Sequence, residues 1–286
     1  MATFFNQASI SFGGHVTNSN VTVGEVLDTL SVTKSVISSG YGQNGGTVYA
    51  VSLVNSGTAP IGGIQVSDDL GAYTEGGLTL VPFDYVTGSV KLYINGIQVT
   101  SPTVTAGPPL VFSGISLPAG ASALLLYEVD ANAYAPLASG STITNTATVT
   151  AEAPCVDGPI TSSVTVTVSD FTALSIAKSV CPELVAGCDE VTYSFIIQNG
   201  GNVPILATDD LIVSDTFSPA LTNITVTLNS EPLTEGVGYT YDPDTGVFTT
   251  LPGAITVPAA TFVQDPVTGI VTTTPGVAVL TVSGII

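Results

Sequence analysis

Two lysines with matching surroundings are the residues of this sequence most suited to chemistry. Lys34 lies in the stretch Leu30-Ser-Val-Thr-Lys-Ser-Val36, and Lys178 lies in Leu174-Ser-Ile-Ala-Lys-Ser-Val180. A lysine in an apolar strand is costly to bury unless an acid pairs with it. A buried lysine that loses its proton becomes a nucleophile. The two positions therefore predict either buried ion pairs or an acyl-transfer reaction at the lysine Nζ atom.

An acidic residue recurs at a fixed place after each lysine. Val66-Ser-Asp68 matches Val213-Ser-Asp215, so the candidate pairs are Lys34 with Asp68 and Lys178 with Asp215. Lys91 is the only other basic side chain besides the single histidine. Ion pairing is the usual fate of a buried lysine, and it is the simpler of the two interpretations.

The elements that position these residues form two tandem copies of one domain. Lys34 and Lys178 are 144 residues apart, and the same offset joins further identical residues. Each copy contains short segments of β-branched and aromatic residues separated by turn residues, and no long segment has a helical period. Roughly seven strands a copy predict an immunoglobulin-like sandwich. The identical pairs at this offset are Tyr49 and Tyr193, Asn55 and Asn199, Gly57 and Gly201, Pro60 and Pro204, and Ile61 and Ile205.

Composition supports an all-β fold. The 286 residues include 44% hydrophobic but only 9% charged residues, with 30 glycines and 18 prolines to form turns. We therefore predict an all-β protein with two tandem immunoglobulin-like sandwiches. The predicted boundaries are 1–14 for an N-terminal donor strand, 15–169 for the first sandwich and 170–286 for the second.

The order of these motifs resembles a known repeat. A lysine-serine strand, a tyrosine strand ending in Asn-x-Gly, a Val-Ser-Asp segment and then Asn145-Thr-Ala-Thr-Val149 resemble the repeat called domain of unknown function 11. This repeat occurs in tandem in large bacterial and archaeal surface proteins, and the resemblance covers the chain from Leu30 onward. It implies an immunoglobulin-like surface module and no enzymatic activity.

Surface domains of the immunoglobulin type suggest a specific reaction for the lysines. In Gram-positive bacteria some of them join a first-strand lysine to a last-strand asparagine as an amide, assisted by a buried acid. The corresponding residues are Lys34, Asp68 and Asn145 in the first copy, and Lys178 and Asp215 with Asn6 of a neighbouring chain in the second copy. The alternative is an ion pair at each lysine, with the asparagine serving only as a turn or ladder residue.

The second copy is predicted to be incomplete. Its counterpart of Asn145 would fall beyond residue 286, whereas Asn6-Gln-Ala-Ser-Ile-Ser11 at the start of the chain resembles Asn145-Thr-Ala-Thr-Val-Thr150. Val16-Thr-Asn-Ser-Asn-Val-Thr-Val23 likewise resembles Ile160-Thr-Ser-Ser-Val-Thr-Val166. The chain thus reads as circularly permuted. We expect residues 16–34 to belong to the first sandwich.

The leading segment is therefore predicted to be a donor strand for the second sandwich of a neighbouring chain. An open sheet edge invites a strand from another chain, and head-to-tail contacts that do not close a ring produce filaments. Two alternatives are a frayed tail or extra edge strand on the first sandwich, and insertion into the second sandwich of the same chain. The donor residues are Phe4, Phe5, Asn6, Ala8, Ile10 and Phe12.

Charge limits the partners. Three lysines and no arginines against 22 acidic residues give a net charge of −19, which argues against nucleic acid and anionic membranes. No apolar run approaches the roughly 20 residues that cross a bilayer, and no signal peptide is evident. The sequence suggests no cofactor and no metal site. Cys181 and Cys188 could form a disulfide, which would leave Cys155 unpaired; three reduced cysteines are the alternative.

These observations together predict a function. We expect a structural subunit of an extracellular filament on a cell or spore surface, assembled from copies of itself. The alternative is a monomeric stalk or ligand-binding module of a bacterial surface adhesin. Either role fits an all-β surface protein, and the two differ in whether the leading segment drives assembly.

Overall fold

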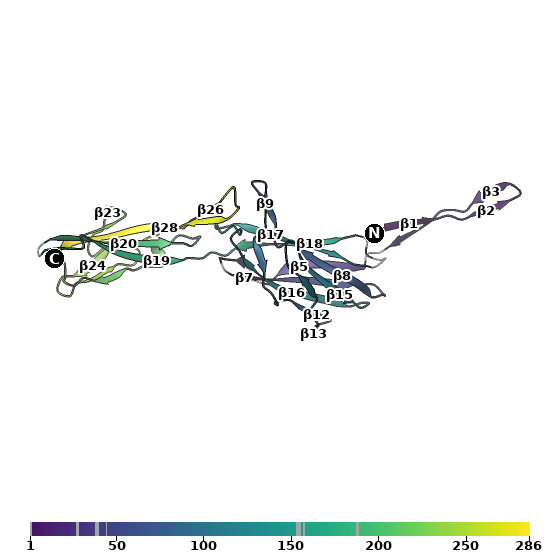
Figure 1. Ribbon diagram of the computed structural model, residues 1–286, viewed down its shortest axis with the longest axis horizontal. Coiled ribbons are helices and arrows are strands. Elements are labelled where there is room, and N and C mark those ends of the chain that lie inside the picture. Colours follow the sequence, from purple (N-terminus) through teal and green to yellow (C-terminus); the bar gives the residue numbers. More distant parts are fainter. Residues whose placement is uncertain are drawn as a thin grey trace. The chain divides into compact units, whose positions relative to one another are not determined.

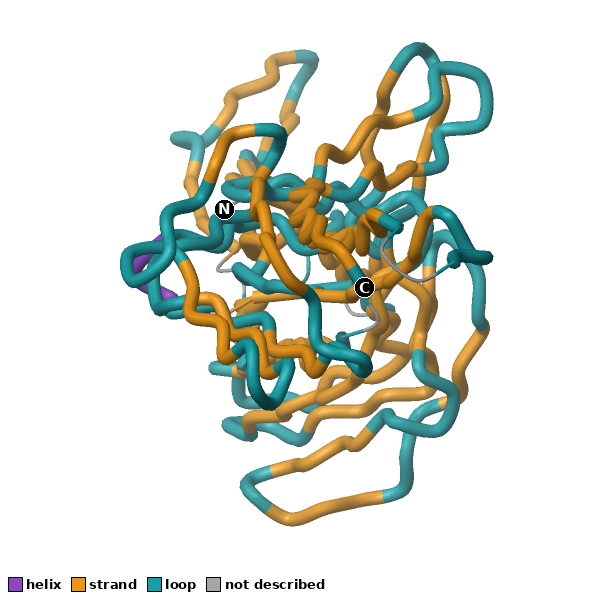
Figure 2. The backbone as a smooth tube through the Cα atoms, turned by 90° about the vertical axis from the view of Figure 1, so that its left-hand side faces the viewer, coloured by secondary structure: helices purple, strands orange, loops and turns teal. Residues whose placement is uncertain are grey.

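The structure is a computed structural model that describes residues 2–26, 29–37, 40–43, 45–152, 156, 158–186 and 189–286. It is built almost entirely of strands, with a single short 3-10 helix, η1 (Ala207–Asp209), in the described part (Figure 2). The chain divides into two compact units, the first formed by residues 1–135 and 142–167 and the second by residues 136–141 and 168–286. The prediction of an all-β protein with two immunoglobulin-like sandwiches is confirmed.

Unit 1 contains two six-stranded sheets. Its buried residues alternate along the strands, as in the inner faces of a sandwich, and Tyr49, Phe112 and Tyr127 are among the largest fully buried side chains. The first sheet has the order β13 (Ile97–Val99), β12 (Lys91–Ile94), β16 (Ser122–Ala131), β7 (Gly46–Asn55) and β5 (Leu30–Val36), with β11 (Phe83–Tyr85) also paired to β16. The second has the order β14 (Thr103–Thr105), β15 (Leu110–Leu117), β8 (Ile61–Asp68), β17 (Thr142–Thr150), β18 (Ile160–Val168) and β6 (Gly40–Tyr41). A separate hairpin joins β9 (Tyr73–Glu75) and β10 (Leu78–Leu80).

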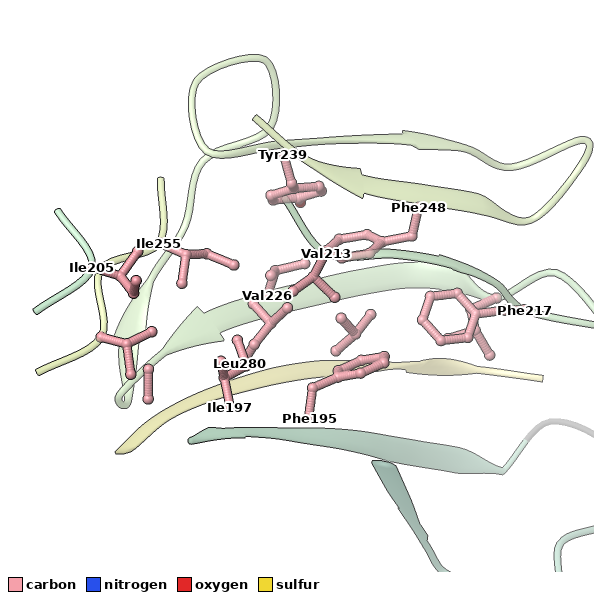
Figure 3. Packing of buried hydrophobic residues seen from close by; sticks show 14 of the residues in the cluster. Phe195, Ile197, Ile205, Val213, Phe217, Val226, Tyr239, Phe248, Ile255 and Leu280 are labelled. Atoms are coloured by element: carbon pink, nitrogen blue, oxygen red, sulfur yellow. The ribbon is translucent and has the colours of Figure 1, made fainter. Parts of the chain in front are cut away.

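Unit 2 repeats five of the six strands in the first sheet of unit 1, all except β11, which accounts for the repeat in the sequence. Its five-stranded sheet has the order β19 (Leu174–Cys181), β20 (Glu190–Asn199), β28 (Gly276–Ile285), β22 (Thr222–Leu228) and β23 (Glu231–Pro232). Opposite it lies a three-stranded sheet of β21 (Ser214–Thr216), β25 (Val247–Thr250) and β24 (Tyr239–Asp242), and β26 (Thr261–Gln264) pairs with β27 (Val271–Thr274). The two sheets enclose an apolar core that includes Phe195, Phe217, Phe248 and Leu280 (Figure 3).

A buried asparagine explains one part of the repeat. In unit 1 the Asn55 side chain accepts a hydrogen bond from the Gly57 backbone and donates to the carbonyls of Ala59, Leu117 and Pro118. In unit 2 Asn199 makes the equivalent bond with Gly201 and donates to Val203 and Pro258. These side chains fasten the turn after the tyrosine strand, so the Asn-x-Gly match in the sequence reflects a shared structural turn.

Residues 2–26 form a two-stranded hairpin, which we call the N-terminal arm (Figure 1, purple). β1 (Ala2–Asn6) pairs with β4 (Thr22–Val26), and β2 (Ser9–Phe12) pairs with β3 (His15–Asn18). The sequence predicts a single leading strand, but residues 15–26 fold back and pair with it. Of residues 16–34, which are predicted to belong to the first sandwich, Leu30 to Lys34 lie in β5 of its first sheet, whereas residues 16–26 lie in the arm.

The turn of the arm is the reason for this difference. Gly13 and Gly14 both have positive φ angles, 57° and 81°. Two consecutive residues in this region form the tight turn that suits the right-handed twist of a hairpin, and glycine adopts it without strain. The Gly-Gly pair between two alternating segments is therefore a hairpin signal, which the comparison with the second copy obscured.

Candidate functional site

The structure brings Lys34 and Asp68 together in the interior of unit 1. Lys34 is on the inner face of β5, and Asp68 is the last residue of β8 in the opposite sheet. The Lys34 Nζ atom forms an ion pair with Asp68 Oδ2, and both side chains are fully buried. The Tyr127 hydroxyl donates to the same carboxylate oxygen, and Nζ lies 4.6 Å from the centre of the Tyr49 ring. Each charged group in this cluster is therefore paired with or hydrogen-bonded to another buried group.

Burial changes the protonation of this cluster. It lowers the pKa of the Lys34 ammonium below its usual value, although the neighbouring Asp68 carboxylate opposes this shift. Burial, followed by the Asp68 charge, raises the pKa of the Tyr127 hydroxyl well above its usual value. The lysine thus reaches its neutral, nucleophilic form more easily than a lysine in water, while the tyrosine stays protonated and can donate a hydrogen bond.

Asn145 is the third candidate residue of unit 1, and it lies on the strand beside Asp68. β17 pairs with β8 so that Ala147 stands opposite Asp68, which places Asn145 at the neighbouring diagonal position of the same face. Its side chain is fully buried, and its Oδ1 and Nδ2 atoms form no well-aligned hydrogen bond with the described residues, among which the amide interacts only with the Tyr49 hydroxyl, whose pKa burial raises and this amide lowers. Such a buried amide costs about 1–3 kcal/mol. The amide is thus poorly satisfied as an ordinary core residue.

The corresponding pair of unit 2 is far more open. Lys178 forms an ion pair with Asp215, but its side chain is 40% exposed, whereas that of Lys34 is 0% exposed. The Lys178 Nζ atom lies 4.7 Å from the centre of the Tyr193 ring, much as Lys34 lies over Tyr49. Unit 2 lacks a counterpart of Tyr127, because Val282 occupies that place opposite Tyr193.

The exposure of Lys178 follows from an open sheet edge. In unit 1, β8 lies between β15 and β17, and β18 lies beyond β17. In unit 2, β21 corresponds to β8 and pairs with β25 on one side, but in the described chain no strand pairs with its other side. We call that side of β21 the open edge. Unit 2 therefore offers unpaired backbone groups where unit 1 has two further strands.

The strand that carries Lys178 is exposed for the same reason. Leu174 of β19 is 45% exposed, whereas Leu30 at the same place of β5 is 4% exposed. Ile176 of β19 is exposed as well. In unit 1 a residue of β18 reaches β5 directly, since the Lys34 backbone N–H donates to Ser162 Oγ over 2.8 Å. Two strands that complete unit 1 are thus without counterparts among the described residues of unit 2.

The predicted donor residues lie in the N-terminal arm with their side chains in solvent. Phe4, Phe5, Ile10 and Phe12 are all exposed, and Phe12 reaches 90%. Asn6 and Ala8 are exposed too, and Asn6 stands opposite Thr22 of the same arm. Water-exposed aromatic residues in a two-stranded hairpin bury little apolar surface, so such a hairpin is at most marginally stable by itself.

The remaining sequence-predicted site residues are the cysteines. Cys181 is an exposed free cysteine, while Cys188 and Cys155 fall outside the described residues. Among the described residues no group of three or more potential metal ligands occurs, and no helix is long and apolar enough for a bilayer. Sequence reasoning missed Tyr127, whose only signal was its place at the end of the apolar segment Ala121-Ser-Ala-Leu-Leu-Leu-Tyr127.

Comparisons with known proteins give structural likenesses only. No protein-family model and no curated protein matches the chain, so the resemblance to domain of unknown function 11 stays a prediction. BcpA, the major pilin subunit of Bacillus cereus, is similar at 12% identity and a TM-score of 0.37, over 87% of this chain and 65% of BcpA. SpaD, a major pilin of Corynebacterium diphtheriae, is similar at 13% identity and a TM-score of 0.37, over 85% of this chain and 58% of SpaD. This chain spans less than two thirds of either pilin, and likenesses of this degree carry no argument about function.

Proposed function

We propose that this protein is a structural subunit of an extracellular filament on a cell or spore surface. Its copies join head to tail, and the N-terminal arm of one copy occupies the open edge of unit 2 in the next. The role is mechanical, with no cofactor and no enzymatic activity. The observation that carries the proposal is the open edge of β21, together with an arm whose sequence resembles the strand that pairs with the equivalent β8.

The physical cause of assembly is that the open edge and the arm each expose groups that the other can cover. The open edge exposes backbone N–H and C=O groups, and the arm exposes large apolar side chains. Strand addition pairs the backbone groups and buries the apolar surface in one step. Each copy has one arm and one open edge at different places, so the contact is heterologous and produces an open chain unless it closes into a ring.

The arrangement in unit 1 also supports a covalent lock. Under the proposal, neutral Lys34 Nζ attacks the Asn145 side-chain carbonyl carbon. A new C–N bond forms, the C–Nδ2 bond breaks, and the amine proton leaves with Nδ2 as ammonia. Asp68 in its protonated form polarises the carbonyl and relays the proton. The product amide removes the buried lysine charge and the unsatisfied Nδ2 donor together.

The same reaction between chains would lock the filament. Lys178 and Asp215 already form a pair in unit 2, and the place of Asn145 is open there. If the arm takes the place of β17, Asn6 occupies the position of Asn145 and meets Lys178. Successive subunits would then be joined by amide bonds, and the filament would resist hot detergent.

Removal of the arm tests the proposal. A chain without residues 2–26 is expected to stay monomeric in size-exclusion chromatography, while the full chain forms filaments in negative-stain electron microscopy. The Lys178→Met variant is the matched control for the covalent step: its filaments should form but dissolve in hot detergent. Equal assembly with and without the arm would refute the proposal and favour a stalk or binding module.

A further inference from the structure

The N-terminal arm has a leading half, β1 and β2, and a returning half, β3 and β4, and two strands of unit 1 are without counterparts among the described residues of unit 2. We propose that the arm enters a second copy of this chain as an intact hairpin. The leading half, β1 and β2, takes the place of β17, and the returning half, β3 and β4, takes the place of β18. This inference rests on the proposed function, because it assigns the way in which the arm docks.

Both halves of the arm match the strands that they would replace. Asn6-Gln-Ala-Ser-Ile-Ser11 resembles residues 145–150 of β17, and Val16–Val23 resembles residues 160–166 of β18. β17 and β18 pair with each other antiparallel in unit 1, as the two halves of the arm do. The donated piece is thus already an antiparallel pair like β17 and β18, in a register one residue away, because Asn6 stands opposite Thr22 whereas Asn145 stands opposite Val164, the match of Val21.

A single donated strand would leave part of unit 2 uncovered. In unit 1, β17 pairs with β8, whereas β18 contacts β5, because Ser162 Oγ of β18 accepts a hydrogen bond from the Lys34 backbone N–H. In unit 2, a single strand added to the open edge would fill only the place of β17. The place of β18, which lies beside β19, would stay empty. Leu174 and Ile176, both exposed on β19, mark the surface that a second strand is positioned to approach.

The hairpin also explains the two glycines at its tip and a third in its returning half. Gly13 and Gly14 form the two-residue turn with positive φ angles that joins β2 to β3. Gly24 stands opposite Phe4, and a side-chain carbon added at Gly24 would overlap the Phe4 ring. These residues organise a hairpin and would be unnecessary in a single extended donor followed by a linker.

The match fixes the register of docking. In unit 1, Ala147 stands opposite Asp68 and Thr148 opposite Ser67. The equivalent arrangement puts Ala8 opposite Asp215 and Ser9 opposite Ser214 of the second copy. Strand alternation then turns a fixed set of side chains inward. The inward set is Phe4, Asn6, Ala8 and Ile10, whose counterparts Ile143, Asn145, Ala147 and Val149 are all buried in unit 1.

The turn of the arm provides the first test. The double substitution Gly13→Val with Gly14→Val places two β-branched residues in the left-handed region and should weaken or slow assembly by about 30-fold or more. Gly13→Asn is the matched control, because Asn-Gly keeps the same turn, and it should assemble like the unchanged chain. Assembly is followed by light scattering, and folding of unit 1 by its thermal transition.

The outcomes separate the inference from the proposed function. If the unchanged chain assembles and the double variant assembles equally well, the donor is a single strand and the hairpin inference is wrong. If the unchanged chain does not assemble at all, both the proposed function and the inference are wrong. A loss of assembly in the double variant alone, with Gly13→Asn unaffected, supports the hairpin.

Cysteine pairs test the register in the full chain, with the three native cysteines replaced by serine. Ser9→Cys with Ser214→Cys should form disulfides between chains under mild oxidation, since directly opposed strand residues have suitable spacing. Gln7→Cys with Ser214→Cys is the matched control on the same face and should not form them. Disulfide-linked oligomers from the control pair alone would show that the register is wrong. A disulfide within one chain would show that the arm does not dock on a second copy.

Discussion

Replacing the buried Lys34–Asp68 pair by apolar side chains distinguishes an ion pair from a covalent cross-link. The change is the double substitution Lys34→Met with Asp68→Leu. If the two residues form only an ion pair, the substitution is neutral or stabilises unit 1 by about 1–4 kcal/mol, because both buried charges disappear together. The structure makes this a clear case, since both side chains are fully buried.

A cross-link predicts the opposite sign. An amide between Lys34 and Asn145 would close a loop of about 110 residues, and a covalent link across about 100 residues stabilises the folded state by about 4.7 kcal/mol. The double variant cannot form the amide and should lose a stabilisation of this order. We predict a loss of about 4–5 kcal/mol in unit 1 from the missing link, to which the Asn145 amide left without a partner adds about 1–3 kcal/mol.

The assay combines intact mass with urea unfolding of the full chain. The unchanged protein should be lighter than its sequence by about 17 Da, because Asn145 loses its Nδ2 atom as ammonia when it joins Lys34, and the double variant should show no such deficit. Lys91→Met is the matched control, because Lys91 is exposed on β12 and its loss should change neither mass deficit nor stability. An unchanged protein of full sequence mass, with a double variant at least as stable, would refute the cross-link.

Three further predictions concern stability. Asn199→Ala should destabilise unit 2 by about 2–3 kcal/mol in urea unfolding, because the Asn199 side chain donates to two carbonyls and accepts from a backbone N–H; an effect below 0.5 kcal/mol, on the order of a surface change, would contradict this. Phe248→Ala should cost about 3–5 kcal/mol, since Phe248 is fully buried, whereas exposed Val247→Ala should change little; equal effects would contradict the described packing. Burial raises the pKa values of the Tyr49 and Tyr127 hydroxyls, so in alkaline solution the folded chain keeps protons that the unfolded chain loses. The free energy of unfolding should therefore fall as the pH rises above about 10. Thermal unfolding midpoints that do not change in alkaline solution would refute this.

The sandwich architecture was predictable because its signals are local. Alternating β-branched segments and the repeated Asn-x-Gly turn depend on short-range pattern, and they recur at one offset. The pairing of Lys34 with Asp68 also followed from the sequence, since a buried lysine needs an acid and only one acidic motif recurs with it. These features need no knowledge of how distant strands pair.

The hairpin form of the arm was not predicted, for a physical reason. Val16–Val23 resembles β18 as closely as the leading segment resembles β17, so the comparison indicated a place in a sandwich and not pairing within the arm. The local Gly13-Gly14 signal favoured a hairpin. Tyr127 was missed because strand periodicity shows only that a residue faces inward, and not that its hydroxyl meets a carboxylate of the opposite sheet.

The most direct test of the account is to mix the full chain with a chain that lacks residues 2–26. The shortened chain can accept an arm at its open edge but cannot donate one, so it should stop growth when it joins a filament. At one shortened chain in ten, the mean filament length measured by electron microscopy should fall to about ten subunits. Filaments whose length is unchanged by an equimolar amount of the shortened chain would contradict assembly through the arm.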